Sequence, residues 1–565
     1  MNYLDEINAR FLNHFRSDVD VSVSLGLPDH LGRLGDPSLD AHWQSVDDSR
    51  KLLDEIDDDR SSDFYERLDL QLIRRYLQQD LYFKTLENHG ELQRRRKPAG
   101  VDGVSEGIFQ LFVNDERGSA DRLADILSRL RQAPAYLEEE LAVLSTPVKR
   151  WRDIELARAA KIPELFASIL VWARETEFPD TAALGREVAQ VNGALQAYRD
   201  ALSELPTTDK FSIGIDKVEE LLALKQIDKT PEQLRQMTAD YARETQQILE
   251  ELRQRLVHKY RLDSATDAAT LHEFLNREYA VELEDNEPAP VLEHYHRERE
   301  TILRFIRDRQ LFPIPDDQDM VIMLTPGFLQ PVIPAGAMWP PLALREGTAK
   351  SMVHLTIKEN ELDEHTRLGI CTMMIHEGIP GHHLQFASAV QQPSLVRKMF
   401  NANEHAEGWT TMLEDYMLDA GYVDSDIKDE VRFVAKRDIS RLVARVGIDL
   451  YFMIGDKHYL DVGLDLVFDS DDPFENAALL LKTATGFTDG RVQAELNWYS
   501  TEQCYPLSYL TGNRMVWEMK NDLLDANLKQ LSIDELDREF HRIYLQSGCM
   551  PVASLREVFR HEGFL

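Results

Sequence analysis

The sequence has few cysteines, no excess of positive charge and no long apolar run, and each absence argues against a class of protein. Its 565 residues include 3 cysteines with no CxxC pair, so a disulfide framework is not expected. Acidic residues number 99 against 64 basic ones, a formal net charge of −35, which disfavours nucleic-acid and anionic-membrane partners. The sequence has no run of about 18 apolar residues, so no transmembrane helix is predicted. Residues 1–6 resemble no signal peptide, so a cytoplasmic location is expected.

Most of the chain shows the pattern of amphipathic helix. Apolar residues recur at three- and four-residue spacing over 66–90, 119–145, 150–175, 182–204 and 230–258. Seven prolines between Leu311 and Leu342 exclude helix there, and Met352–Ile357 alternates as a half-buried strand does. Helical pattern resumes at about Glu361. The sequence therefore predicts a mainly α fold, with a helical half at 1–310, a small β-containing segment near 311–360, and a second half at 311–565, the two halves possibly forming one continuous domain.

The residues with the clearest chemistry follow an apolar helical run and read His376-Glu377-Gly378-Ile379-Pro380-Gly381-His382-His383. Imidazole is the usual protein ligand for zinc, and a Glu beside the first His is where zinc hydrolases keep their general base. In a regular helix of about 100° per residue, His383 lies about 20° from His376 and His382 about 120° away. A kink at Pro380-Gly381 would bring His382 into line, so both histidines are metal-ligand candidates. The alternative is a helix-breaking turn with structural histidines.

A third ligand is expected from the next helical segment, His405–Asp419. Its apolar stripe leaves Glu407, Thr411 and Glu414 on the opposite face, where carboxylates also commonly face water. Glu407 follows His383 by 24 residues, a separation at which zinc enzymes commonly place a glutamate ligand. Glu414 is then suited to orient a ligand histidine.

These motifs resemble a bacterial family known as domain of unknown function 885, regarded as zinc metallopeptidases of the zincin type. The resemblance extends to an arginine-rich helix, a late tyrosine-glycine motif and a terminal Phe-His and Gly-x-x-Pro pattern. The matching stretches are Arg437–Gly447, Glu495–Tyr499, Ser508–Gly512, Phe540-His541 and Gly548–Pro551. The family implies a large helical zincin-like fold with a deep cleft between two halves, which admits short peptides.

The hypothesis is that Zn²⁺, held by His376, His382 or His383 or both, and Glu407, activates a water for hydrolysis of a small peptide substrate. Glu377 would act as general base. By family position Tyr509 is the first candidate to stabilise the oxyanion and Tyr499 the second, and His541 is a further candidate. Arg437, Arg441 and Arg445 recur at four-residue spacing, which predicts one helix face suited to bind a substrate carboxylate or, equally, a salt-bridged stripe.

The chain departs from the family's usual residues at Arg445, Asp449 and Gln503-Cys504-Tyr505. These departures motivate an alternative, a helical binding or regulatory protein with a vestigial metal site. A metal-dependent hydrolase of non-peptide amides or esters is a second alternative, because the same zinc-water chemistry would serve it.

Overall fold

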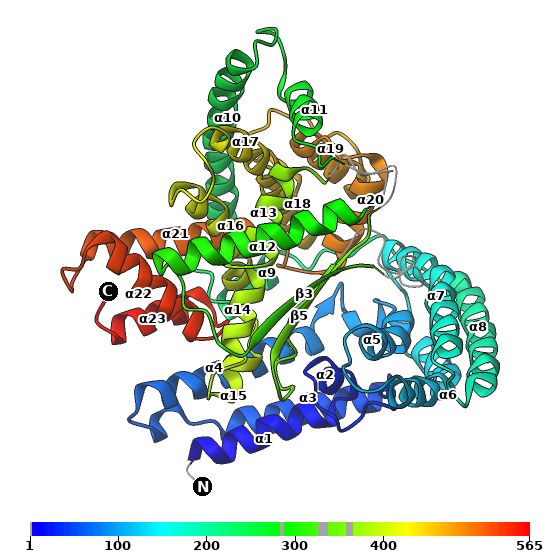
Figure 1. Ribbon diagram of the computed structural model, residues 1–565. Helices are drawn as coiled ribbons and strands as arrows, with labels where there is room; N and C mark the ends of the chain where they lie inside the picture. The colour runs from blue at the N-terminus through cyan, green and yellow to red at the C-terminus, as the bar shows by residue number, and fades with distance from the viewer. Residues whose placement is uncertain (1–2, 283–287, 326–336, 358–364) are drawn as a thin grey trace. The chain divides into compact units, whose positions relative to one another are not determined.

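The computed structural model describes residues 3–282, 288–325, 337–357 and 365–565. The fold is mainly helical, as the sequence predicted (Figure 1). Within the described part of the chain, no helix is both long enough and apolar enough to cross a membrane.

The chain divides into two compact units, and their boundaries differ from the predicted one at residue 310. Unit 1 comprises Met1–Ile213, Thr325–Gly347 and Ser394–Met399, and unit 2 comprises Gly214–Leu324, Thr348–Pro393 and Phe400–Leu565. Residues 214–310 therefore belong with the C-terminal residues, because their helices pack on helices from that part of the chain. Sequence periodicity identifies such helices but not the partners on which they pack.

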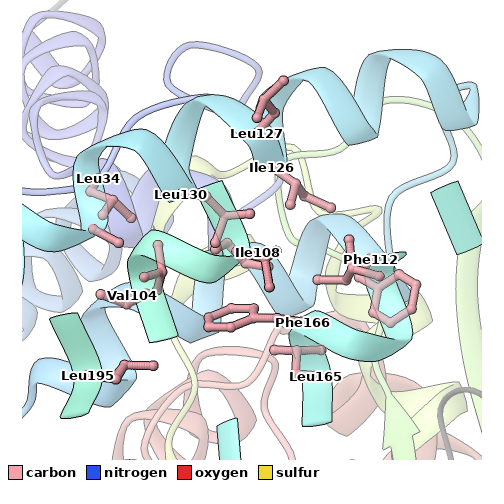
Figure 2. Close-up of a cluster of buried hydrophobic side chains, with 14 of the residues drawn as sticks. Leu34, Val104, Ile108, Phe112, Ile126, Leu127, Leu130, Leu165, Phe166 and Leu195 are labelled. Atoms are coloured by element: carbon pink, nitrogen blue, oxygen red, sulfur yellow. The ribbon is translucent and has the colours of Figure 1, made fainter. Parts of the chain in front are cut away.

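Unit 1 is a helical unit with one small hairpin. Its elements are α1 Tyr3–Ser17, α2 Val19–Ser24, α3 Leu39–Glu55, α4 Phe64–Thr85, β1 Glu87–Asn88, β2 Glu91–Leu92, α5 Gly100–Val113, α6 Ser119–Val143, α7 Lys149–Glu175, α8 Thr181–Glu204, β4 Ala337–Trp339 and α15 Leu395–Met399. Helices α5 to α8 surround an apolar core that includes Ile108, Leu130 and Phe166 (Figure 2). Burial of these side chains at the predicted helical spacing is what holds the unit together.

Unit 2 carries the predicted site. Its elements are α9 Ile215–Leu224, α10 Pro231–Lys259, α11 Ala268–Glu278, α12 Ala289–Arg309, β3 Gln318–Leu324, β5 Ala349–Leu355, α13 Arg367–Glu377, α14 His382–Ala389, α16 Asn403–Asp419, α17 Lys428–Ile439, α18 Arg441–Ile454, α19 Pro473–Thr485, α20 Asp489–Thr501, α21 Ser508–Ala526, α22 Ile533–Gln546 and α23 Val552–His561. Helix α10 begins at a capping box of Thr230 and Gln233 with Pro231 in the first turn.

The predicted β-containing segment is present. Strands β3 and β5 pair in parallel, with Gln318 opposite Ala349 and Leu324 opposite Leu355 (Figure 1). Strand β5 overlaps the strand expected at Met352–Ile357 and ends two residues earlier. The expected restart of helix at Glu361 lies outside the described residues, and the first described helix after the strand is α13.

Candidate metal centre

Three of the predicted ligands come together in unit 2. Nitrogens of His376 and His382 and a carboxylate oxygen of Glu407 all lie within 4.8 Å of one another. His376 is in the last turn of α13, His382 opens α14 and Glu407 lies in the second turn of α16. Three separate helices thus present the donor set His, His and Glu to one point.

The turn between α13 and α14 brings His382 to this point. Helix α13 ends at Glu377, and a new helix starts at His382 after a turn with a cis Ile379–Pro380 peptide bond. A side chain at Gly381 would overlap the backbone carbonyl of His376, so the turn requires glycine there. The indole Nε1 of Trp409 donates to the carbonyl oxygen of Pro380 at 2.9 Å, which ties the turn to α16.

His383, the alternative candidate ligand, lies outside the cluster of His376, His382 and Glu407. Its Nδ1 lies 2.7 Å from the hydroxyl of Ser351, and its Nε2 lies 2.6 Å from the amide oxygen of Gln318. Both ring nitrogens are therefore engaged with the strands β5 and β3. Burial lowers the pKa of His383 to about 4, so the ring is neutral at pH 7. The regular-helix geometry that favoured His383 fails because the helix breaks before it.

Glu407 is buried, and its two oxygens have different surroundings. Oε1 accepts a hydrogen bond from the hydroxyl of Tyr505 at 3.0 Å. Oε2 lies 3.5 Å from Nε2 of His382 and 3.8 Å from Nε2 of His376, and within the described residues it receives no hydrogen bond. Burial by itself would raise the pKa of Glu407, but the two imidazoles and the Tyr505 hydroxyl lower it to about 2. The carboxylate is thus ionised and directed at the imidazoles.

Glu414 fixes the orientation of His376. Its Oε1 lies 2.8 Å from Nδ1 of His376, so that nitrogen carries the proton and Nε2 is left facing Glu407. Burial by itself would lower the pKa of His376, but the hydrogen bond to Glu414 and the charges of Glu377, Glu414 and Glu407 raise it. This is the orienting contact that the sequence predicted for Glu414.

Two glycines let α16 and α21 approach closely at the site. A side chain at Gly408 would come within 2.5 Å of the backbone of Gly512, and one at Gly512 would overlap the carbonyl of Glu404. The backbones are therefore in direct contact next to Glu407, and this contact places the start of α21 and the loop before it beside the carboxylate.

A cavity of about 530 Å³ opens beside the cluster within unit 2. Its wall includes His376, Glu377, Glu414, Arg437 and Arg441. The predicted base Glu377 therefore borders the same space as a ligand histidine. Arg441 pairs with Asp438.

The three predicted arginines do not share one helix face. The expected helix breaks at Ser440, between α17 and α18. Arg445 lies outside the described cavity wall. It donates to the Tyr499 hydroxyl at 2.9 Å and to Glu495 at 3.1 Å. The guanidinium of Arg445 is thus bonded to other side chains of the protein and does not border this cavity.

Two of the three residues predicted to stabilise the oxyanion, Tyr499 and His541, are buried and bonded to other groups of the protein. The hydroxyl of Tyr499 is bonded to Glu495 at 2.5 Å and to Arg445, and its side chain is buried. His541 is fully buried, bonded through Nδ1 to the Leu311 carbonyl oxygen and stacked on Phe312. Tyr509 is partly exposed. Burial raises the pKa of its hydroxyl, and the charge of the nearby Glu407 carboxylate raises it further. Tyr509 does not line the described cavity wall, and its role as an oxyanion donor stays a prediction.

Sequence reasoning missed two residues at the site. Tyr505 stands in the stretch that departs from the family pattern, and no local signal links it to a carboxylate 98 residues away. Arg491 lines the cavity, stacks on Phe487 at 3.7 Å and lies outside the arginine-rich segment. Among the described residues, no carboxylate lies within salt-bridge distance of either Arg491 or Arg437. Arg437 donates to the Ala268 carbonyl oxygen at 2.6 Å, and the charges of Asp267 and Glu273 lie near it.

The donor set fits a zinc ion. Two imidazole nitrogens and one carboxylate oxygen are a common catalytic zinc set, which leaves a fourth position for water. Glu407 Oε2, a buried anionic oxygen without a hydrogen bond in the described chain, is the kind of group that a cation would satisfy. Glu414 on His376 supplies the carboxylate–histidine contact typical of such sites.

The fold and this cluster define a mainly helical protein with a candidate His, His and Glu metal centre. A family model described as a bacterial protein of unknown function (DUF885) matches residues 21–558, and the chain belongs to that family. No match was found among curated proteins.

Two solved structures share the fold. One is the "putative lipoprotein of unknown function" from Shewanella oneidensis, with a TM-score of 0.76 and 16% identity over 99% of this chain and 100% of that one. The other is the "putative lipoprotein" from Colwellia psychrerythraea, with a TM-score of 0.75 and 17% identity over 99% of each chain.

The contact between α16 and α21 generates a prediction about stability. The substitution Gly512→Ala places a methyl group against the Glu404 carbonyl. It should lower the free energy of unfolding by about 1–3 kcal/mol, the usual cost of overpacking. Gly193→Ala, in an open part of α8, should instead be neutral or stabilise by up to about 1 kcal/mol. Calorimetric unfolding of both variants measures the difference. Equal melting temperatures would show that the two helices are not in contact at Gly512.

Proposed function

We propose that this protein is a zinc-dependent hydrolase of short peptides. The observation that carries the proposal is the buried Glu407 oxygen directed at the Nε2 atoms of His376 and His382, beside a cavity that Glu377 borders. This oxygen faces the two imidazole nitrogens at 3.5 and 3.8 Å without a well-aligned hydrogen bond from the described chain, and a cation between them would satisfy it.

Zinc bound by His376, His382 and Glu407 would lower the pKa of a coordinated water to about 7. Glu377, next to His376 and on the cavity wall, would take the proton of this water and deliver it to the leaving amine. Glu414 keeps the proton of His376 on Nδ1 and so keeps Nε2 as the metal-facing atom. Tyr509, near Glu407, is the residue proposed to donate to the developing oxyanion.

The cavity suggests a substrate of limited size with a negatively charged end. A volume of about 530 Å³ suits a short extended peptide and excludes a folded protein. Arg437 and Arg441 lie on the wall with His376, and no carboxylate of the described residues lies within salt-bridge distance of Arg437. The proposal is that this guanidinium binds the C-terminal carboxylate of the substrate. The cytoplasmic location expected from the sequence stays a prediction.

The first prediction is one zinc ion per chain. Protein stripped with a chelator and reloaded with zinc should contain one equivalent by elemental analysis. His382→Ala should lose most of it, because the substitution removes a ligand. His383→Gln, which can still hydrogen-bond Ser351 and Gln318, should keep it. Wild-type protein that cannot be reloaded with zinc would overturn the catalytic proposal.

The second prediction separates base from ligand. Glu377→Gln should retain zinc while kcat/KM for peptide cleavage falls by a factor of about 10² or more, as expected when a general base is removed. Glu518→Gln, an exposed change on α21, should leave both properties unchanged. Undiminished cleavage by Glu377→Gln would refute the assigned mechanism, and loss of zinc would make Glu377 a ligand.

A third prediction concerns the substrate's end. Amidating the C-terminus of one cleaved peptide should remove a charged hydrogen bond worth about 1.5–3 kcal/mol, and so reduce kcat/KM roughly 10- to 150-fold. In Arg437→Gln the free acid and the amide should be cleaved at similar rates. If the wild-type enzyme cleaves both forms equally, the arginines do not recognise a carboxylate.

A further inference from the structure

Among the described residues, Tyr505 donates a hydrogen bond to one oxygen of Glu407 and leaves the other without a donor. Its hydroxyl lies in the loop between α20 and α21 and donates to Oε1 at 3.0 Å, while Oε2 is left for the two imidazoles. A carboxylate ligand can bind a cation through one oxygen or both, and a hydrogen bond to one oxygen favours the other as the single ligand atom.

We infer that Tyr505 is a positioning residue that holds Glu407 as a ligand through Oε2 alone. The inference rests on the proposed zinc site and extends it to a residue that the family resemblance does not assign. Tyr505 would act through Glu407 and would not itself touch the substrate.

The loop that carries Tyr505 is anchored on both sides of it. The buried carboxylate of Asp449 accepts hydrogen bonds from the backbone N–H of Cys504 at 3.2 Å and of Leu507 at 3.0 Å. Cys504 has a positive φ of 62°, a conformation that non-glycine residues adopt only where the surroundings hold it. The backbone of Tyr505 is therefore fixed independently of its hydroxyl.

The ring of Tyr505 is held by a second set of contacts. It packs edge-on against Trp498, with centroids 5.2 Å apart, and against Tyr509, at 5.8 Å. The guanidinium of Arg445 lies over the Tyr509 ring at 4.4 Å and over Trp498 at 5.2 Å. The arginine that does not border the cavity thus supports the aromatic cluster behind the metal ligand.

Removing the hydroxyl tests the inference. Tyr505→Phe keeps the ring contacts and the Asp449 anchors, but leaves Oε1 without its donor. Contacts that orient a metal ligand typically change metal affinity 10- to 100-fold, so we expect the zinc dissociation constant to rise by that factor. The measurement is competition against a chromophoric chelator at fixed pH.

Tyr422→Phe is the matched control. Its hydroxyl donates to Oε1 of Glu298 at 2.6 Å, which is the same kind of tyrosine–carboxylate bond in unit 2, outside the cluster. Its zinc affinity should equal that of the wild type. If both variants lose affinity equally, the effect is a general one of losing a tyrosine hydroxyl, and the inference falls.

The absorption spectrum of the cobalt(II)-substituted protein adds a readout that misfolding cannot imitate. Tyr505→Phe that still binds cobalt should show altered d–d bands, because Glu407 is free to bind through both oxygens. An unchanged spectrum together with unchanged zinc affinity would overturn the role of Tyr505 while leaving the zinc site intact. A wild-type protein that binds neither metal would overturn the proposed function as well.

Discussion

The position of one carboxylate, Glu407, organises the candidate site. It is buried, ionised and in contact with groups from three other parts of unit 2: His376 at the end of α13, His382 at the start of α14 and Tyr505 before α21. Burying an unpaired carboxylate is costly, so these neighbours determine whether the arrangement is stable. With a cation between Oε2 and the imidazoles, each buried polar atom of the cluster would have a partner.

The surrounding helices meet this constraint through close backbone contacts. Gly408 and Gly512 bring α16 and α21 together beside Glu407, and Gly381 allows the chain to fold back on the end of α13. The Trp409 indole then joins the turn to α16. Ordinary side chains at any of these glycines would separate the helices and with them the donor atoms, which links the packing of the unit directly to the geometry on which the proposed chemistry depends.

Much of the architecture follows from local signals, and the rest depends on contacts between distant residues. Helices such as α7 and α8 follow from apolar periodicity, and His376, Glu407 and Glu414 follow from residue type and spacing. The choice of His382 over His383 required the actual path of the turn, which a regular-helix calculation does not give. The break at Ser440 and the engagement of Arg445 with Glu495 likewise depend on packing. Tyr505 has no local signal, because its partner is 98 residues away.

Three residues that the sequence analysis singled out as unlike the family pattern, Arg445, Asp449 and Tyr505, contact one another's surroundings near Glu407. Asp449 anchors the loop, Tyr505 contacts the candidate ligand and Arg445 stacks on the aromatic rings behind it. These substituted positions form a connected support for Glu407.

Zinc K-edge X-ray absorption of the reloaded protein reports directly on whether His376, His382 and Glu407 hold the metal. The account predicts two imidazole nitrogens at about 2.0–2.1 Å and one carboxylate oxygen at about 2.0–2.2 Å, with a further light atom completing the sphere. His382→Ala should lose most of its zinc, and the zinc that it keeps should show one imidazole fewer. Sulfur scattering at about 2.3 Å, or a spectrum unchanged by His382→Ala, would place the zinc elsewhere and contradict the account.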